Sequence, residues 1–200
     1  MGAISNDIAI FPKPGEPLLL RIGNPMPDGV LTMPTSSSLI AALHTNQPAA
    51  DRAEKMKLYG WLVDRGGRWE MDTIVYGDDG TPQPGRGEIH FGWVLEGRGI
   101  QDVWILPGVF HGTTLRVYDP ALDAWHILWS DPLRQYYSRQ LGRASGKDIV
   151  QEGHNSAGDA VRWSFTEITP DSFRWIGERS QNQGETWRMD ADFSARRLKS

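Results

Sequence analysis

The sequence predicts an all-β protein, a closed up-and-down antiparallel barrel of ten strands, and three observations lead to this prediction. Short segments in which apolar and polar residues alternate follow one another from residue 67 onward. Turn signals rich in Gly, Asn, Asp and Pro separate these segments at hairpin length, with no helical pattern between them. Seven of the nine tryptophans lie between Trp93 and Trp187, spread over successive segments. A meander of this kind removes its exposed edges when it closes on itself.

Residues 1–47 differ in character and predict a Pro-rich arm, which precedes a barrel domain over residues 48–200. The arm holds six of the 13 prolines and two short apolar pieces, Leu18–Ile22 and Val30–Met33. These pieces bury too little area to fold alone, so we expect the arm to dock on the barrel or on a second subunit. A homodimer formed through the arm is thus one prediction, and a lid over the barrel mouth is the functional alternative. Residues 36–44 are expected to form a helical turn.

A short helix is expected between the arm and the barrel. Asn46 is predicted to be its N-cap, with Pro48 in the first turn, where the missing N–H is harmless. A narrow apolar stripe at helical spacing consists of Ala49, Ala53 and Met56. The helix is expected to end near Gly60 and to plug or brace the barrel.

The ten strands are expected at 67–76, 87–95, 98–107, 112–118, 124–130, 136–143, 147–153, 159–167, 172–179 and 186–196. Alternation is clearest late in the chain, where Val161, Trp163 and Phe165 oppose polar neighbours. In the last strand, one apolar face is predicted to carry Trp187, Met189, Ala191 and Phe193. A sheet with one dry and one wet face is typical of antiparallel pairing.

Hairpin register predicts which side chains face the interior. If residues 120–122 form a turn, Tyr118 lies opposite Trp125 and Arg116 lies opposite Ile127. With a two-residue turn at 96–97, the predicted inner set is Phe91, Trp93, Ile100, Asp102, Trp104, Thr114, Arg116, Tyr118, Trp125, Ile127 and Trp129. A slip of one residue would exchange the two faces, and the chosen register keeps the aromatic rings out of water.

Arg116 would then be a buried cation, which needs a carboxylate partner from the protein or from a ligand. Asp102 is the natural partner within the chain because it lies on the same predicted face. Two interpretations stay open at this point. The two residues form a structural pair in the barrel wall, or Arg116 anchors a carboxylate, phenol or carbonyl group of a ligand.

The predicted function is the binding of a small apolar or aromatic molecule inside an aromatic-lined barrel. The expected ligand-binding residues are Trp93, Trp104, Arg116, Tyr118, Trp125, Trp129, Trp163, Trp175 and Trp187. The alternative is a cofactor-independent enzyme, a lyase, isomerase or cyclase. In that alternative Asp102, His90 or Tyr118 moves a proton, and Arg116 stabilises developing negative charge.

Composition argues against several other classes. The chain has 21 Lys and Arg against 25 Asp and Glu without a basic stripe, so no nucleic-acid partner is expected. It has no cysteine, and its histidines lack metal-binding spacing, so neither a metal nor a cofactor is expected. No apolar run approaches the length that crosses a bilayer, so the prediction is a cytoplasmic protein without membrane contact.

A family resemblance adds to this interpretation. Gly67-Arg68-Trp69, just after the predicted helix, resembles the Gly-x-Trp signature of the calycin superfamily, which includes lipocalins, fatty-acid-binding proteins and nitrobindins. In that superfamily an arginine from the last strand commonly stacks across the tryptophan. The resemblance therefore implies this role for Arg196 or Arg197 and leaves the choice open.

The middle of the chain is similar to a bacterial lipocalin-like group of unknown function. The segments that carry this similarity are 91–98, 101–104, 112–119 and 129–131. The resemblance covers about residues 55–197 and implies a ten-stranded calycin barrel. Nitrobindins bind haem through one histidine, but their haem-binding motif is not recognisable here, so haem is not predicted.

Overall fold

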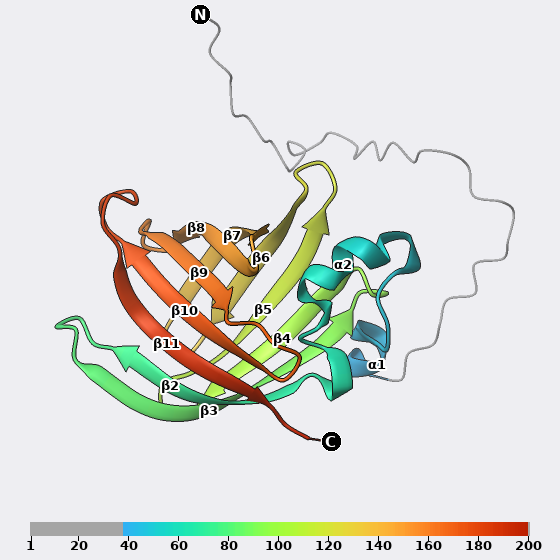
Figure 1. The fold of residues 1–200 in the computed structure, drawn as a ribbon, viewed down its shortest axis with the longest axis horizontal. Coiled ribbons are helices and arrows are strands. Elements are labelled where there is room, and N and C mark those ends of the chain that lie inside the picture. The colour runs from blue at the N-terminus through green and yellow to red at the C-terminus, as the bar shows by residue number, and fades with distance from the viewer. Residues whose placement is uncertain (1–37, 200) are drawn as a thin grey trace, which may run out of the picture. The chain divides into compact units, whose positions relative to one another are not determined.

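The structure, a computed structural model, describes residues 38–199 and contains a closed antiparallel β-barrel of ten strands (Figure 1). The helices are α1 (Leu39–Leu43) and α2 (Ala53–Gly60), with 3₁₀ turns at Ala50–Arg52 and Asp64–Gly66. The strands are β1 (His44–Thr45), β2 (Arg68–Tyr76), β3 (Pro82–Val94), β4 (Gly99–Leu106), β5 (Phe110–Asp119), β6 (Ala124–Asp131), β7 (Tyr136–Ser145), β8 (Asp148–Asn155), β9 (Ala160–Thr166), β10 (Ser172–Ser180) and β11 (Arg188–Arg197). The two apolar pieces predicted in the arm, Leu18–Ile22 and Val30–Met33, lie outside the described residues.

The barrel is an up-and-down meander, which confirms the predicted fold class. Each strand from β2 to β11 pairs with the next one along the chain, and the β2–β11 pairing closes the barrel. The short strand β1 adds to the outside of this order by pairing with β3. The predicted hairpin registers are also correct, since Arg116 lies opposite Ile127, Tyr118 opposite Trp125 and Phe91 opposite Asp102. Short turns leave little room for a slip, so turn length fixed these pairings.

The predicted start of the second helix is wrong. Asn46 does not cap a helix, because it lies in a bend, Ala49 is extended and the Ala49 N–H donates to the Gly97 carbonyl at 3.0 Å. The 3₁₀ turn starts only at Ala50, and α2 follows from Ala53. Within the predicted 36–44 helical turn, α1 is present and Ser38 caps it by accepting from the Ala41 N–H.

Helix α2 and the residues after it fill one end of the barrel (Figure 1). The fully buried side chains there are Met56, Tyr59, Leu62 and Trp69. The Trp69 indole N–H donates to the Leu62 carbonyl at 2.9 Å. The closed end is therefore a packed core in which the first barrel strand is joined to the segment that follows the helix.

Arg197, rather than Arg196, is the arginine that covers Trp69. Its guanidinium lies 4.0 Å from the centre of a Trp69 ring, and it donates to the carbonyls of Trp61 at 2.8 Å, Pro170 at 3.0 Å and Asp64. Arg196 is half exposed on the outer face and pairs with Asp72 at 2.9 Å. Neighbouring strand residues point to opposite faces, so only one of the two arginines reaches the barrel end.

A β-bulge changes the face pattern of the last strand. Gly177 pairs with Ala191 but Glu178 pairs with Met189, so Asp190 is an extra residue in β11. The alternation reverses there, and Trp187 lies on the outer face, 4.2 Å from the Arg162 guanidinium. The prediction that Trp187 shares the face of Ala191 and Phe193 is therefore wrong.

No helix in residues 38–199 combines the length and the apolarity that a membrane-spanning helix requires.

Replacing Arg197 should destabilise the barrel more than replacing its neighbour. Arg197→Met uncovers Trp69 and leaves three carbonyl groups without their donor, so the free energy of unfolding should fall by about 2–4 kcal/mol. Arg196→Met is the matched control and should change it much less, because solvent surrounds its ion pairs. Urea denaturation followed by circular dichroism measures both. Equal losses in the two variants would contradict this account of the closed end.

Candidate functional site

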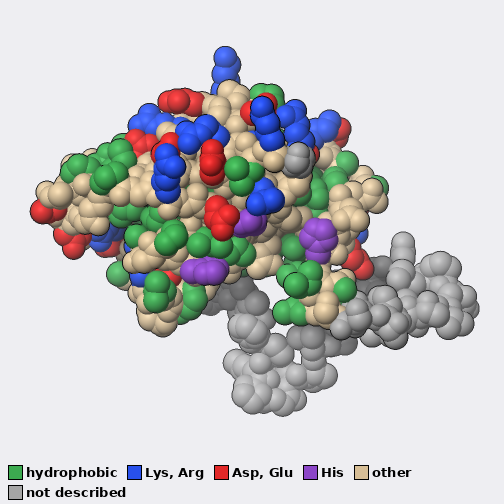
Figure 2. Space-filling view, turned by 90° about the horizontal axis from the view of Figure 1, so that it is seen from below, with side chains coloured by type: hydrophobic (Ala, Val, Ile, Leu, Met, Phe, Trp, Pro, Cys, Tyr) green, Lys and Arg blue, Asp and Glu red, His purple; other side chains and the backbone are tan. Residues whose placement is uncertain are grey.

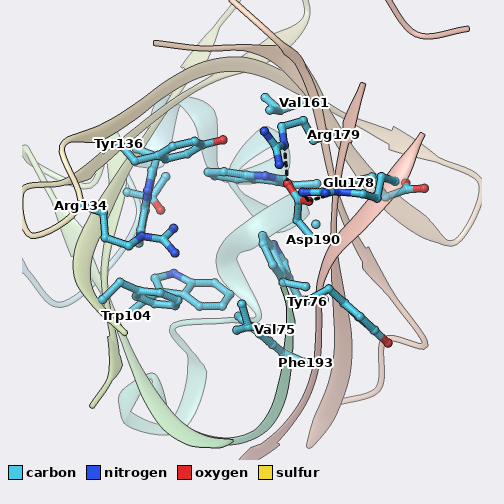
Figure 3. Close-up of a pocket in the computed structure, with 18 of the residues that line it drawn as sticks. Val75, Tyr76, Trp104, Arg134, Tyr136, Val161, Glu178, Arg179, Asp190 and Phe193 are labelled. Carbon is cyan, nitrogen blue, oxygen red and sulfur yellow. Dashed lines mark hydrogen bonds and ion pairs between the residues drawn. The ribbon is translucent and has the colours of Figure 1, made fainter. Parts of the chain in front are cut away.

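The end of the barrel opposite α2 holds a cavity of about 340 Å³ (Figure 3). Its Trp and Phe lining comes from β4, β5, β6, β9, β10 and β11 and consists of Trp104, Phe110, Trp129, Trp163, Trp175 and Phe193. Tyr76 and Tyr136 are the other aromatic residues of the lining. Smaller apolar side chains, among them Val75, Val161 and Ala191, complete the wall. The volume and the mainly apolar lining are those of a small-molecule pocket.

The tryptophans form a connected band that borders the cavity and joins strands that do not pair with each other, such as β4 and β10. Trp175 lies at the centre, with its ring centroid 5.4 Å from that of Trp104 and 5.5 Å from that of Trp163. Trp163 in turn lies 6.0 Å from Trp129 in an edge-to-face arrangement. Trp175 also stacks on Phe193, with 5.1 Å between the centroids and 25° between the planes. Because each ring is held by its neighbour, the band presents pre-positioned flat apolar surfaces.

The predicted pair of Asp102 and Arg116 is present in the barrel interior. Both residues are 1% exposed, and an Arg116 Nη1–H donates to Asp102 Oδ2. The other carboxylate oxygen of Asp102 accepts the Thr114 backbone N–H at 2.7 Å. The Arg116 guanidinium also lies 5.4 Å from the centre of the Tyr59 ring and lines the inner part of the cavity. A protein carboxylate therefore balances the buried cation, as the first of the two interpretations expects.

Charged side chains surround the mouth of the cavity. On one side, Arg179 and Arg188 both donate to the Asp190 carboxylate, at 2.9 Å to each of its oxygens. Arg188 also bonds Asp78, whose pKa it holds below the ordinary value of a carboxyl group. The other side is formed by Arg134 and Tyr136 (Figure 3). Burial raises the pKa of the Tyr136 hydroxyl, which is therefore protonated at neutral pH.

The residues predicted to bind a ligand fall into three places. Those that line the cavity are Trp104, Arg116, Trp129, Trp163 and Trp175. Those packed at the closed end are Trp93, Tyr118 and Trp125, where Tyr59 makes an edge-to-face contact with Trp125 at 5.0 Å. Trp187 lies outside, because of the bulge. Inner-face position thus does not by itself place a residue at the cavity, since the helix fills half of the interior.

The three residues proposed to move a proton lie apart. Asp102 is engaged by Arg116 inside the barrel. Tyr118 is hydrogen-bonded to Asp123 near the closed end, on the side of α2. His90 lies on the outer face of β3, with its Nε2 atom 3.2 Å from a Glu88 carboxylate oxygen. The structure brings none of these three groups together around a common point.

Sequence reasoning did not find the residues of the mouth, namely Asp78, Arg134, Tyr136, Arg179, Arg188 and Asp190. Regular alternation places Arg188 and Asp190 opposite the apolar face predicted for this strand, on the outside, but the bulge brings them to the cavity. Arg134 lies in the turn between β6 and β7, where no alternation indicates a direction. The only sequence signal for this turn is the Asp131-Pro132 dipeptide, since Asp and Pro are typical turn residues. In the structure Asp131 accepts the Leu133 and Arg134 backbone N–H groups and so shapes the turn.

Other hollows of the described part, such as the one lined by Arg143, Glu152 and Arg162, have a more polar lining than the cavity. Figure 2 shows Lys and Arg side chains interspersed with Asp and Glu, and histidines that lie separately from one another. Residues 38–199 contain no group of three or more His, Asp or Glu side chains that could hold a metal ion. The cavity is therefore the best-defined candidate site of the described chain.

No protein-family model matches the chain, and no curated protein is similar to it in sequence. The barrel and its cavity are therefore the features from which a function can be inferred.

A double-mutant cycle tests the role of the buried pair. Arg116→Met leaves a buried carboxylate without its cation, and Asp102→Asn leaves a buried cation while keeping an acceptor for the Thr114 N–H. Each change should lower the free energy of unfolding by about 3–5 kcal/mol, and the double variant should lose much less than the sum. Denaturant titration gives the four values. Additive losses would show that the pair does not stabilise the barrel as a unit.

Proposed function

We propose that this protein binds a small, flat, aromatic or apolar molecule in its cavity, in the manner of a lipocalin-like barrel. The observation that carries the proposal is the connected band of Trp104, Trp175, Trp163 and Trp129 that borders the cavity. A protein gains no stability from leaving space beside such rings, because an unfilled volume forfeits their dispersion contacts. A planar guest restores those contacts.

The size of the cavity supports a guest of about two fused rings. Binding removes apolar surface of both guest and tryptophans from water, which stabilises the complex by about 25 cal/mol for each Å². Aromatic pairs add about 0.5–1.5 kcal/mol each beyond burial. After the loss of translational freedom, a dissociation constant of about 1–100 μM is expected for a guest of this size.

The geometry favours binding over the acid–base alternative. Catalysis requires polar groups to converge on one atom of a substrate, at about 3 Å. Asp102, His90 and Tyr118 lie in three separate surroundings, and none of the three lines the cavity. Arg116, which pairs with Asp102, does line it. Binding needs only the apolar wall, which is already assembled.

Filling the cavity should abolish binding. Naphthalene-2-carboxamide, a neutral flat probe, should bind the wild-type protein saturably, as measured by calorimetry and by a change in tryptophan emission. Ala191→Phe adds a ring within the cavity and should weaken binding at least about tenfold by occupying the guest's volume.

Ala144→Phe is the matched control, because the same ring is added at an exposed position of β7. It should leave the affinity unchanged. Equal binding by the wild-type protein and Ala191→Phe would place the probe elsewhere. The proposal would be overturned if neither this amide nor the corresponding acid, naphthalene-2-carboxylate, bound the wild-type protein saturably.

A further inference from the structure

We infer that the guest of this cavity is an aromatic carboxylic acid, whose carboxylate is bound at the mouth by Arg134. The inference rests on the proposed function and adds the chemical class of the ligand. At the mouth of the cavity, Arg134 is the arginine whose Nη groups make no hydrogen bond within residues 38–199.

Each of the four arginines that line the cavity bonds a carboxylate of the protein, but they differ in how many guanidinium nitrogens are used. Arg116, in the interior, bonds Asp102 through Nη1, and its buried Nε has no partner among the described residues. Arg179 uses all of its guanidinium nitrogens, since Nε bonds Asp190, Nη1 bonds Asp159 and Nη2 bonds Asp78. Arg188 likewise bonds Asp190 and Asp78 through the whole of its fork. This side of the mouth therefore needs no ligand to complete it.

Arg134 differs from Arg179 and Arg188, the other two arginines of the mouth. Only its Nε–H is used, in a hydrogen bond of 2.9 Å to Asp131 Oδ2, and neither of its Nη groups bonds an acceptor within residues 38–199. The Asp131 side chain is fully buried and also accepts two backbone N–H groups of the turn, so it holds the arginine stem in place. An anchored guanidinium with both Nη groups free matches the two oxygens of a carboxylate in geometry and charge.

The direction of Arg134 supports this role. Figure 3 shows its guanidinium pointing into the cavity, with Tyr136 on one side and Trp104 on the other. Its central carbon lies 5.6 Å from the centre of the Phe110 ring and 5.8 Å from that of Tyr136, so aromatic faces fix its position. The protonated Tyr136 hydroxyl is a further donor on the same side of the mouth.

The arrangement of polar and apolar groups indicates how the acid is oriented. Beneath Arg134 the lining is the tryptophan band, which accepts a flat ring but offers a carboxylate no charge of its own. Arg116 is the only cation deeper inside, and Asp102 already neutralises it. A ring in the cavity with its carboxylate at the mouth places each part of the guest against matching chemistry.

The test compares two probes of nearly the same shape, naphthalene-2-carboxylate and naphthalene-2-carboxamide, by calorimetry at pH 7.5. The wild-type protein should bind the acid at least about tenfold more tightly than the amide. Measurable binding of the acid with binding of the amide too weak to detect also supports the inference. Added NaCl should reduce this preference, because Arg134 is partly exposed and the interaction is screened.

Two substitutions then assign the preference to Arg134. Arg134→Gln should bring the affinities for the acid and the amide within about twofold of each other, while Arg134→Lys, which keeps the charge but not the fork, should retain an intermediate preference. Arg139→Gln is the matched control, because it removes the same charge from an exposed position in β7 close to Arg134. It should leave the preference unchanged.

The outcomes separate this inference from the proposed function. Equal binding of acid and amide by the wild-type protein, or a preference that Arg134→Gln leaves intact, overturns the inference while binding itself stands. If neither probe binds the wild-type protein, the proposed function fails and the inference with it. Should Arg134→Gln fail to fold, the preference of the wild-type protein and its retention in Arg134→Lys decide the question.

Discussion

The packing of α2 into one end of the barrel is the constraint on which the rest of the structure depends. A ten-stranded barrel has an interior too wide for its own side chains to fill evenly. Here Met56, Tyr59 and Leu62 fill one end, and the Trp69–Arg197 contact closes it. Because the helix occupies that end, the remaining interior space lies at the other one. The location of the cavity is thus a consequence of how the barrel is closed.

The Asp102–Arg116 pair forms the boundary between the filled and the open halves. Arg116 contacts the Tyr59 ring on the side of the helix and lines the cavity on its other side. A buried ion pair is a poor source of net stability compared with an apolar pair, but breaking it is costly. The pair therefore lies between the packed residues around Tyr59 and the space that the tryptophans line, so breaking it would affect both parts of the interior.

Much of the fold could be predicted because its signals are local. Alternation and short turns define each hairpin, and the register of Arg116 against Ile127 follows from turn length alone. What could not be predicted depends on contacts distant in the chain or on one extra residue. The bulge at Asp190 moves Trp187 outward and Arg188 inward, although the sequence around it alternates regularly. Trp93 and Trp125 face inward as expected, but only the position of α2 decides that they are core rather than cavity.

The division between stability and recognition follows the hydrogen bonds of the polar groups. At the closed end, Arg197 donates to three carbonyls, and at one side of the mouth Asp190 receives two arginines, so these groups are satisfied by the protein itself. Such groups hold the barrel together and would lose bonds if they turned toward a guest. Arg134 is fixed in place by Asp131, but its Nη groups donate to no acceptor within residues 38–199. This costs little free energy at a partly exposed mouth, because water can accept their hydrogen bonds. A guest that displaces this water must itself offer acceptor oxygens to the Arg134 Nη groups. This requirement favours a guest that carries a carboxylate.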